Sequence, residues 1–242
     1  MTASLPSGGR APAGTDGPWV RVSPPQPRKR VDRDLARIDD WLRSYVGSVH
    51  PELGRRGPVC PFVPPALSDH AVQFSLRYEI DGLDGALLHR TLEAEIRDFV
   101  RVARPVPHSG TSLESRVVAL PDTGPEGWRT LDQEYEALKN KAVDSGLMIG
   151  QFHPHCDERA VRNPAFRVSV APLGVLAIRR MAPHDVLFLH DRRNWFGIYD
   201  RLFRSYYQRG RIRDPLLRRL HRAGVGRHGL PPVVVQEHEK EE

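Results

Sequence analysis

The sequence predicts an α/β or α+β fold, in which a mixed β-sheet is flanked by helices within a single domain. Segments with apolar residues at every second position alternate along the chain with segments in which apolar residues recur every three or four positions. The resulting order of strand, helix, strand, helix and strand is typical of sheets that contain some parallel pairs. No internal repeat interrupts this order.

The predicted domain spans residues 31–228 and lies between two segments that lack apolar periodicity. Residues 1–30 contain six prolines and several glycines, and such a segment cannot bury enough apolar surface to offset the entropy lost on ordering. We therefore expect a disordered N-terminal arm at residues 1–30. Residues 229–242 end in a run of charged side chains and are expected to form a flexible tail.

Four elements are predicted in the first half of the domain. A helix from Asp32 to about Val46 has apolar residues at helical spacing behind an aspartate that can cap it. Residues 72–80 alternate strictly between apolar and polar side chains, which indicates a strand with one buried face. Residues 87–100 show the pattern of a long amphipathic helix, and residues 116–120 that of a short strand.

The second half begins with a helix at residues 131–142, which ends before Gly146, a residue that tolerates the positive φ common at helix C-termini. The strand 147–152 follows at once. Aromatic residues near the C-terminus recur every three or four positions, which predicts a packing stripe on a helix and not a platform for stacking bases. The remaining elements are two strands and two helices, at residues 166–170, 175–178, 195–209 and 214–223.

The charge pattern bears on the partners of the protein. The chain carries a formal net charge of +6, and its excess arginines are concentrated in the two C-terminal helices. Such a patch is one sign of nucleic-acid binding, but arginine-rich helices more often present a solvated face, and we favour that interpretation. No stretch reaches the roughly 18–20 uninterrupted apolar residues that a membrane-spanning helix needs, so we expect no membrane partner. The oligomeric state is left open.

The two cysteines, Cys60 and Cys156, stand in unlike sequence contexts. This favours a reducing, cytoplasmic setting over a disulfide framework. Cys60 is followed by Pro61 and Phe62 in a proline-rich loop whose stiff backbone holds the thiol in one place. The three residues are candidates for a substrate pocket, and the alternative is that Cys60 is a small buried hydrophobe.

The predicted strand 147–152 ends in a cluster of side chains that can bind metals. His153, His155 and Cys156 follow it within four residues, but no second ligand pair at zinc spacing appears downstream. A single imidazole in a proline-stiffened loop beside arginines is compatible with haem ligation, which makes His153 a candidate metal ligand. A helix-capping or surface histidine is the alternative.

The polar loop after this cluster contains Arg159, Arg162 and Asn163. Guanidinium groups bind carboxylates and phosphates through two hydrogen bonds, so this loop is a candidate for holding an anionic substrate or cofactor group. The alternative is an internal salt bridge to Asp157, Glu158 or Asp185. No dinucleotide or phosphate loop, serine nucleophile elbow or paired-carboxylate motif is present, which disfavours most familiar enzyme classes.

Three motifs carry a resemblance to known families: Gly57–Phe62, Gly146–Pro154 and Pro172–Asp185. Over roughly residues 40–225 the chain resembles a domain family of unknown function from actinobacteria. More distantly, Cys60-Pro61-Phe62 and His153-Pro154 are similar to motifs of the YqcI/YcgG family, whose members are haem-dependent N-oxygenases acting on amino-acid-like substrates. That resemblance implies haem as cofactor, His153 as a candidate axial ligand and Cys60 as a wall of the pocket.

Two functional hypotheses follow. The first is a small haem-dependent oxygenase of specialised metabolism with a small-molecule substrate, in which Arg159 and Arg162 hold propionates or a substrate carboxylate. Its substrate pocket is lined by Cys60, Pro61, Phe62, His155 and Asn163. The second is a non-catalytic binding or regulatory protein that uses the arginine-lined loop for an anionic ligand, or the basic C-terminal helices for a partner. The first requires His153 and Cys60 to border one hollow.

Overall fold

A five-stranded β-sheet forms the centre of the computed structural model, which describes residues 19–103 and 112–233. Its strands β1, β2 and β3 run parallel to one another, whereas β7 runs antiparallel to both of its neighbours, β3 and β4. This confirms the predicted mixed sheet within a single domain. In spatial order the strands are β1 (Val20–Ser23), β2 (Val72–Arg77), β3 (Ser115–Leu120), β7 (Gly174–Arg180) and β4 (Leu147–Phe152).

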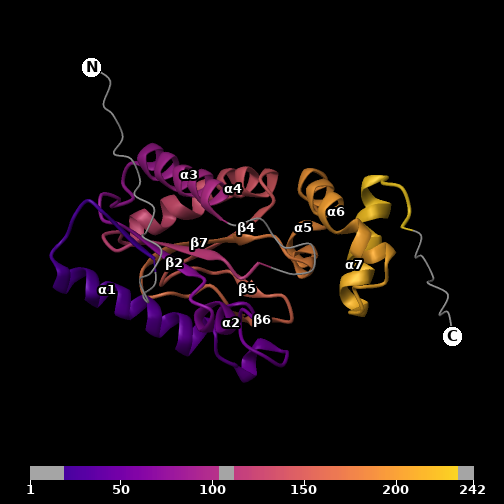
Figure 1. The fold of residues 1–242 in the computed structure, drawn as a ribbon, viewed down its shortest axis with the longest axis horizontal. Helices are drawn as coiled ribbons and strands as arrows, with labels where there is room; N and C mark the ends of the chain where they lie inside the picture. Colours follow the sequence, from indigo (N-terminus) through magenta and orange to yellow (C-terminus); the bar gives the residue numbers. More distant parts are fainter. Residues whose placement is uncertain (1–18, 104–111, 234–242) are drawn as a thin grey trace, which may run out of the picture.

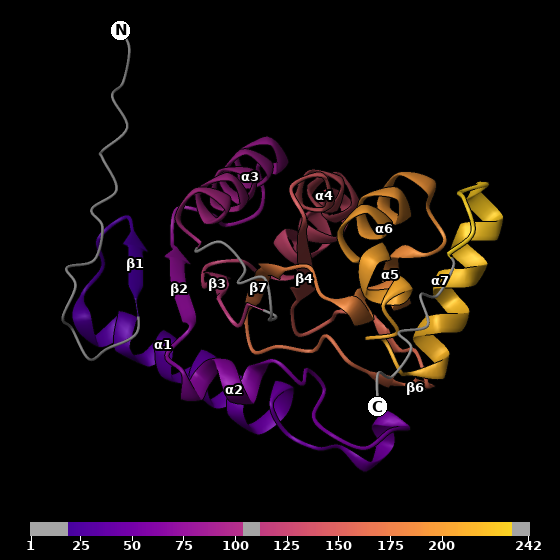
Figure 2. The ribbon, with the colours of Figure 1, turned by 45° about the vertical axis from the view of Figure 1, so that its right-hand side comes forward.

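Helices cover both faces of this sheet and extend past the β4 edge (Figures 1 and 2). One face is covered by α1 (Arg28–Trp41), its π-helical continuation Leu42–Val46 and α2 (Val63–Ser68). The other face is covered by α3 (Gly85–Val102) and α4 (Pro125–Asp144). Beyond β4 lie α5 (Val186–Leu189), α6 (Arg193–Gln208) and α7 (Pro215–His228). Two short 3₁₀ turns, Pro51–Leu53 and Pro183–Asp185, and a separate hairpin of β5 (Arg159–Ala160) and β6 (Asn163–Arg167) complete the described elements.

The alternation of side chains along each strand sorts the core onto the two faces. On β7, Leu176 and Ile178 pack with α3 and α4, whereas Val175 packs on the side of α1. On β4, Leu147 and Ile149 face α3 and α4. Residues 151 and 153 continue this alternation, which directs their side chains toward α4.

The sheet extends further toward the N-terminus than predicted. Residues 20–23, placed in the disordered arm by the sequence, form β1, and α1 begins at Arg28. Backbone bonds fix this strand, because the Phe74 N–H donates to the Trp19 carbonyl at 2.8 Å and the Tyr78 N–H to the Ser23 carbonyl at 2.7 Å. A strand of four residues is too short to show an alternation. Residues 1–18 of the predicted arm lie outside the described residues.

Two other boundaries differ from the prediction. The strand expected at 166–170 lies earlier, as β6, because it pairs with β5 across a tight turn and does not join the main sheet. At the other end, Leu230 and Val233 belong to the predicted tail but pack on the apolar cluster of α6 and α7. Residues 234–242 of that tail lie outside the described residues.

Close backbone contact positions the start of α4 against the rest of the molecule. Gly82 has a φ of 82°, and a Cβ atom added there would lie 2.3 Å from the Cα of Gly127 on α4. Only glycine permits both this conformation and this approach. The contact sets where α4 begins, and therefore where its polar side chains meet β4.

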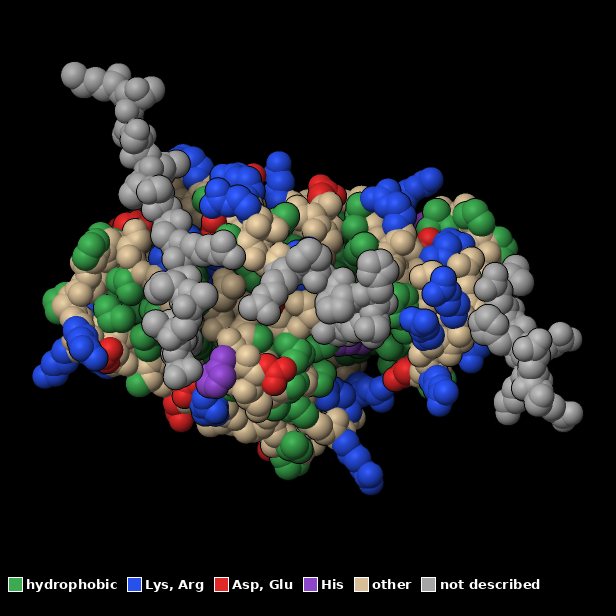
Figure 3. All heavy atoms as spheres, viewed as in Figure 1, with side chains coloured by type: hydrophobic (Ala, Val, Ile, Leu, Met, Phe, Trp, Pro, Cys, Tyr) green, Lys and Arg blue, Asp and Glu red, His purple; other side chains and the backbone are tan. Residues whose placement is uncertain are grey.

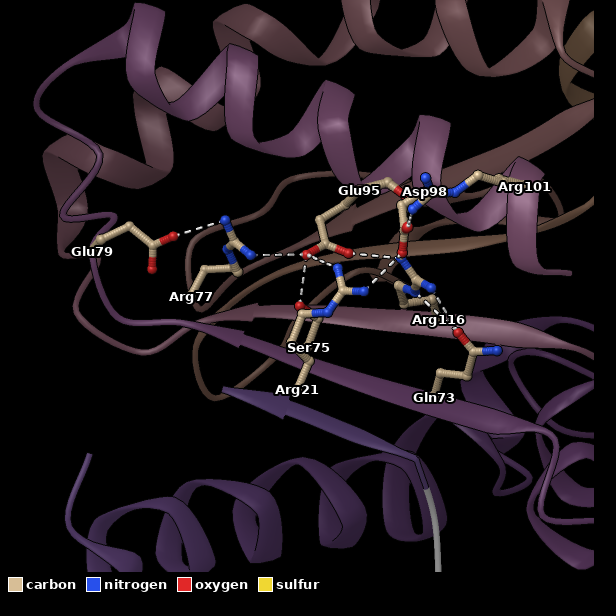
Figure 4. A network of polar contacts seen from close by, with 9 residues as sticks. All are labelled: Arg21, Gln73, Ser75, Arg77, Glu79, Glu95, Asp98, Arg101 and Arg116. Atoms are coloured by element: carbon tan, nitrogen blue, oxygen red, sulfur yellow. Dashed lines mark hydrogen bonds and ion pairs between the residues drawn. The ribbon is translucent and has the colours of Figure 1, made fainter. Parts of the chain in front are cut away.

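A buried network of charges joins the first three strands to α3 (Figure 4). Arg116 on β3 is 0% exposed and donates to Glu95 Oε2 at 2.8 Å, Asp98 Oδ2 at 2.9 Å and Gln73 Oε1 at 2.9 Å. Arg21 on β1 donates to the same Asp98 oxygen at 3.0 Å. Because every charge of Arg116, Glu95 and Asp98 has a partner, the network can stay buried.

Within residues 19–103 and 112–233, no helix is both long and apolar enough to cross a membrane.

The aromatic residues of α6 form the predicted packing stripe, since Trp195, Phe196 and Tyr199 are buried in the cluster with α5 and α7. Figure 3 shows lysine and arginine side chains over the outer surface of α7. Arg218, Arg219 and Arg222 on that helix are exposed.

Replacement of Arg116 should destabilise the fold far more than its surface counterpart. We expect Arg116→Met to lower the free energy of unfolding by about 3–5 kcal/mol, because Glu95 and Asp98 would keep their charges with fewer partners. The matched control is Arg101→Met, whose side chain is 76% exposed beside Asp98 and whose loss should cost less than about 1 kcal/mol. Urea unfolding measures both, and equal losses would contradict a dominant role for the buried guanidinium.

Candidate functional site

Polar side chains gather where β4 ends and the chain turns back toward α4. His153 is 1% exposed, and its Nε2 lies 3.0 Å from Asp132 Oδ1 on α4. The Gln151 side-chain amide donates to the same carboxylate oxygen at 2.7 Å. The ring of Trp128, one helical turn before Asp132, stacks on His153 with 5.9 Å between centroids. We call Trp128, Asp132, Gln151, His153 and Cys156 the β4-end cluster.

Three buried polar atoms in this cluster have no hydrogen-bond partner: Trp128 Nε1, Gln151 Oε1 and His153 Nδ1. A buried polar group without a partner costs roughly 1–3 kcal/mol, and native proteins keep few of them. Only three other buried side-chain atoms in the described part of the chain share this condition. The β4-end cluster therefore holds half of the unpartnered buried side-chain atoms of the described residues.

Cys156 completes the cluster from the loop after β4. Its side chain is 2% exposed, and its Sγ lies 4.0 Å from the Gln151 carbonyl oxygen. Burial raises the pKa of this thiol, and the nearby charge of Asp132 raises it as well. One ligand atom from each of Asp132, His153 and Cys156 lies within 4.8 Å of the other two.

A second group of side chains surrounds the Cys-Pro-Phe loop. The Phe62 ring stacks on His184 with 4.7 Å between centroids, and the Arg179 guanidinium lies 4.9 Å from the Phe62 centroid. Cys60 is half-buried and close enough to Arg179 for a thiolate charge to act on it. We call Cys60, Phe62, Arg179, His184 and Asp185 the Phe62–His184 cluster.

Within this second cluster, His184 and Asp185 play separate roles although they are adjacent in sequence. Asp185 accepts two hydrogen bonds from Arg179, at 2.8 and 2.6 Å, and one from the Ala182 N–H at 2.7 Å, so it caps the turn Pro183–Asp185. The His184 ring has no hydrogen-bond partner among residues 19–103 and 112–233. Burial lowers the pKa of His184, which favours a neutral imidazole.

Lys139 and Tyr135 of α4 lie between the two clusters. The Tyr135 hydroxyl donates to the Ile149 carbonyl of β4 at 2.9 Å, and burial raises the pKa of this phenol. The Lys139 ammonium lies 4.7 Å from the Trp195 ring centroid and 5.6 Å from that of Tyr135. Burial lowers the pKa of Lys139, although the charges of Glu158 and Asp185 oppose that effect. No carboxylate of a described residue lies within ion-pair distance of its Nζ.

The structure separates the residues that the sequence proposed for one site. His153 and His155 both contact Trp128, His155 from an exposed position at 4.9 Å between centroids. Cys60 and Phe62 belong to the other cluster, and Pro61 is exposed in the turn between them. In the described part of the chain, no hydrogen bond, ion pair or ring contact joins His153 to Cys60.

The arginine-bearing loop forms the β5–β6 hairpin, and Arg167 of β6 joins it to the β4-end cluster by donating to the Cys156 carbonyl at 3.1 Å. Arg159 pairs with Asp157, which is the internal salt bridge considered as an alternative. Arg162 is exposed and its backbone packs against Gly54, while the Asn163 amide donates to the Glu52 carbonyl. These contacts give the hairpin a structural role, since Arg159 and Asn163 are held by partners within the protein.

The sequence did not predict several residues of the site. Asp132, Trp128 and Lys139 look like ordinary polar or interfacial positions of an amphipathic helix, and Gln151 looks like an exposed residue of a strand. One signal was available: Trp128, Asp132, Tyr135 and Lys139 recur at spacings of four, three and four, which places them on one side of α4.

The neutral state of His184 should be visible in the pH dependence of stability. Because burial lowers the pKa of His184 below 6.5, its contribution to stability is present above pH 6.5 and is lost as the pH falls through the folded-state pKa. We expect His184→Phe, which keeps a ring against Phe62, to lose less unfolding free energy than the wild type between about pH 7.5 and pH 5.5. Urea titrations at both pH values test this, with the exposed His155→Gln as control. Parallel losses in wild type and His184→Phe would refute it.

Comparison with known proteins identifies the family of this chain. No curated protein and no solved structure matches the chain significantly. A family described as a domain of unknown function, DUF6875, matches residues 35–214, which include every residue of both clusters. The match covers most of the 242 residues and confirms the resemblance to a domain family of unknown function. The chain therefore belongs to the DUF6875 family.

Proposed function

We propose that this protein is a small-molecule enzyme whose active site lies between α4, the edge of β4 and the Phe62–His184 cluster, and that its substrate carries a carboxylate or a similar anionic group. The observation that carries this proposal is Lys139, a half-buried cation without a carboxylate partner among the described residues. An amino-acid-like substrate, as the distant resemblance implies, has the required carboxylate.

The surroundings of Lys139 support binding of an anion. A charge withdrawn from water is costly unless it is paired, and two aromatic faces compensate an ammonium group only in part. A ligand carboxylate would supply the missing countercharge. Arg179 is already neutralised by Asp185, which leaves Lys139 as the cation available to the ligand.

His184 is the group suited to act on such a substrate. Its ring is held flat against Phe62, its nitrogens are free, and burial lowers its pKa so that the imidazole is neutral near pH 7. A neutral imidazole can accept a proton from a substrate or coordinate a metal. Within this proposal, Cys60 of the Phe62–His184 cluster contributes a wall of the pocket. Both cysteines are free thiols, which supports a reducing, cytoplasmic setting.

The distant resemblance implies haem as a cofactor. Of the two histidines, His184 is suited to hold it and His153 is not. At His153 the residues do not fit, because Nε2 is held by Asp132, Trp128 covers the ring, and Arg159 and Arg162 lie on the exposed hairpin. His184 has the free nitrogens and neutral imidazole that an axial ligand requires. Bound haem supplies the activation of dioxygen that an oxygenase needs. Within this proposal, His184 and not His153 would hold the iron of a bound haem.

Removal of the Lys139 charge should weaken anion binding. We expect Lys139→Met to raise the Kd for a bound amino acid or 2-oxo acid roughly ten- to hundredfold, because a hydrogen bond to a charged group is lost. The matched control is Lys141→Met on the same helix, whose side chain is 62% exposed. Thermal shift screening of small carboxylates followed by calorimetry measures both variants. The anion site is wrong if no carboxylate binds the wild type, or if the two variants weaken binding equally.

The haem component has a separate optical test. Protein expressed with a haem precursor should show a Soret band, which should be lost in His184→Ala and retained in His153→Ala. A colourless wild type would remove the oxygenase chemistry while the anion site could still be measured by calorimetry. A band that depends on His153 and not on His184 would contradict the assignment of the axial ligand.

A further inference from the structure

We propose that Asp132, His153 and Cys156 form a binding site for one divalent transition-metal ion of the zinc class. One carboxylate oxygen comes from α4, and one imidazole nitrogen and one sulfur come from the loop that follows β4. The site lies on the α4 side of β4. It is independent of the anion site at Lys139, and each can exist without the other.

The spacing of the three ligand atoms suits a metal ion. Metal bonds of roughly 2.0–2.3 Å at tetrahedral angles place ligand atoms about 3.5 Å apart. The three atoms here lie within 4.8 Å of one another, and His153 Nε2 and Asp132 Oδ1 are already 3.0 Å apart. Closure around an ion therefore requires side-chain movements of about 1 Å, with no rearrangement of α4 or β4.

An ordinary ion pair does not account for the cluster. The ion pair between His153 and Asp132 leaves the nearby Cys156 sulfur outside it, although one ligand atom of each of the three residues lies within 4.8 Å of the other two. Trp128 Nε1 and Gln151 Oε1 are unpartnered, which leaves one donor and one acceptor for a water molecule on the ion. Gln151 and Trp128 hold the Asp132 carboxylate and the His153 ring in place, as the residues around metal ligands commonly do.

The donor set selects the class of ion. A thiolate and an imidazole favour zinc and its neighbours over magnesium or calcium, which prefer oxygen ligands. Three protein ligands with a fourth position left for water are characteristic of catalytic zinc sites and not of structural ones. The Asp132 side chain is 44% exposed, so the open position faces solvent and an ion can enter from that side.

A catalytic triad with Cys156 as nucleophile would use the same three residue types, but the geometry disfavours it. A nucleophilic thiol must be accessible to its substrate and in contact with its base. Cys156 is 2% exposed, and the hydrogen-bond contact of its Sγ is with the Gln151 carbonyl and not with His153. Burial of the sulfur is compatible with metal ligation, since an ion deprotonates its thiol ligand.

Metal binding to the full-length protein tests the proposal. Protein freed of metal with a chelator is titrated with Zn²⁺ by calorimetry and with Co²⁺ by absorption, which reports sulfur ligation as a charge-transfer band. We expect one ion per chain and a sulfur-to-cobalt band that Cys156→Ser abolishes. His153→Gln and Asp132→Asn should raise the Kd at least about tenfold, since changes merely beside a ligand cost that much.

Control variants separate this site from nonspecific binding. Cys60→Ser removes the other thiol and His155→Gln removes the exposed neighbouring imidazole, and both should bind the ion as the wild type does. Asp132→Asn alters a half-exposed position, so it decides the outcome if His153→Gln fails to fold. The proposal is overturned if the wild type binds no ion stoichiometrically, if Cys156→Ser retains the band, or if Cys60→Ser loses it.

Discussion

The packing of α4 on the edge strand β4 is the constraint on which both candidate sites depend. Leu131, Leu138 and Ala142 are fully buried against the sheet, and the Tyr135 hydroxyl fixes the register by bonding the Ile149 carbonyl. The adjacent side of the helix then carries Trp128, Asp132, Tyr135 and Lys139 in a single row along β4. An apolar stripe thus positions a polar one, and the polar stripe supplies Trp128 and Asp132 to the β4-end cluster.

Two polar centres lie on the same face of the sheet, and their hydrogen bonding differs. In the Arg116 network, the two carboxylates and the guanidinium are fully partnered by protein groups, so the network needs no ligand to remain buried. In the β4-end cluster, the protein leaves three buried polar atoms without partners. A purely structural site gains nothing from such atoms, since each one lowers stability. Arg77 and Glu79 of the first network also keep unpartnered atoms, so what distinguishes the second centre is that it combines such atoms with three potential metal ligands.

Sequence periodicity predicted the elements well where a pattern was long, and failed where contacts join distant segments. The strand ending at Phe152 has the predicted bounds, because apolar residues, a preceding glycine and a following proline all agree. β1 was missed because four residues carry too little pattern. Asp132 was missed because an acidic residue on a helix is usually solvated, and its relation to His153 exists only across the packed layers. Arg159 was assigned to the site from proximity in sequence, yet a local partner holds it elsewhere.

The two proposals concern different ligands, but one helix brings them close together. Asp132 and Lys139 are seven residues apart on α4, which corresponds to roughly 10 Å along its axis, with Tyr135 between them. A carboxylate held at Lys139 would leave the rest of a small substrate pointing along this row, either toward His184 or toward an ion at Asp132. Because the helix is rigid and its register is fixed by Tyr135, these distances are set by the fold and not by the ligand. Within the two proposals, a ligand that reaches both sites must therefore span roughly 10 Å along α4.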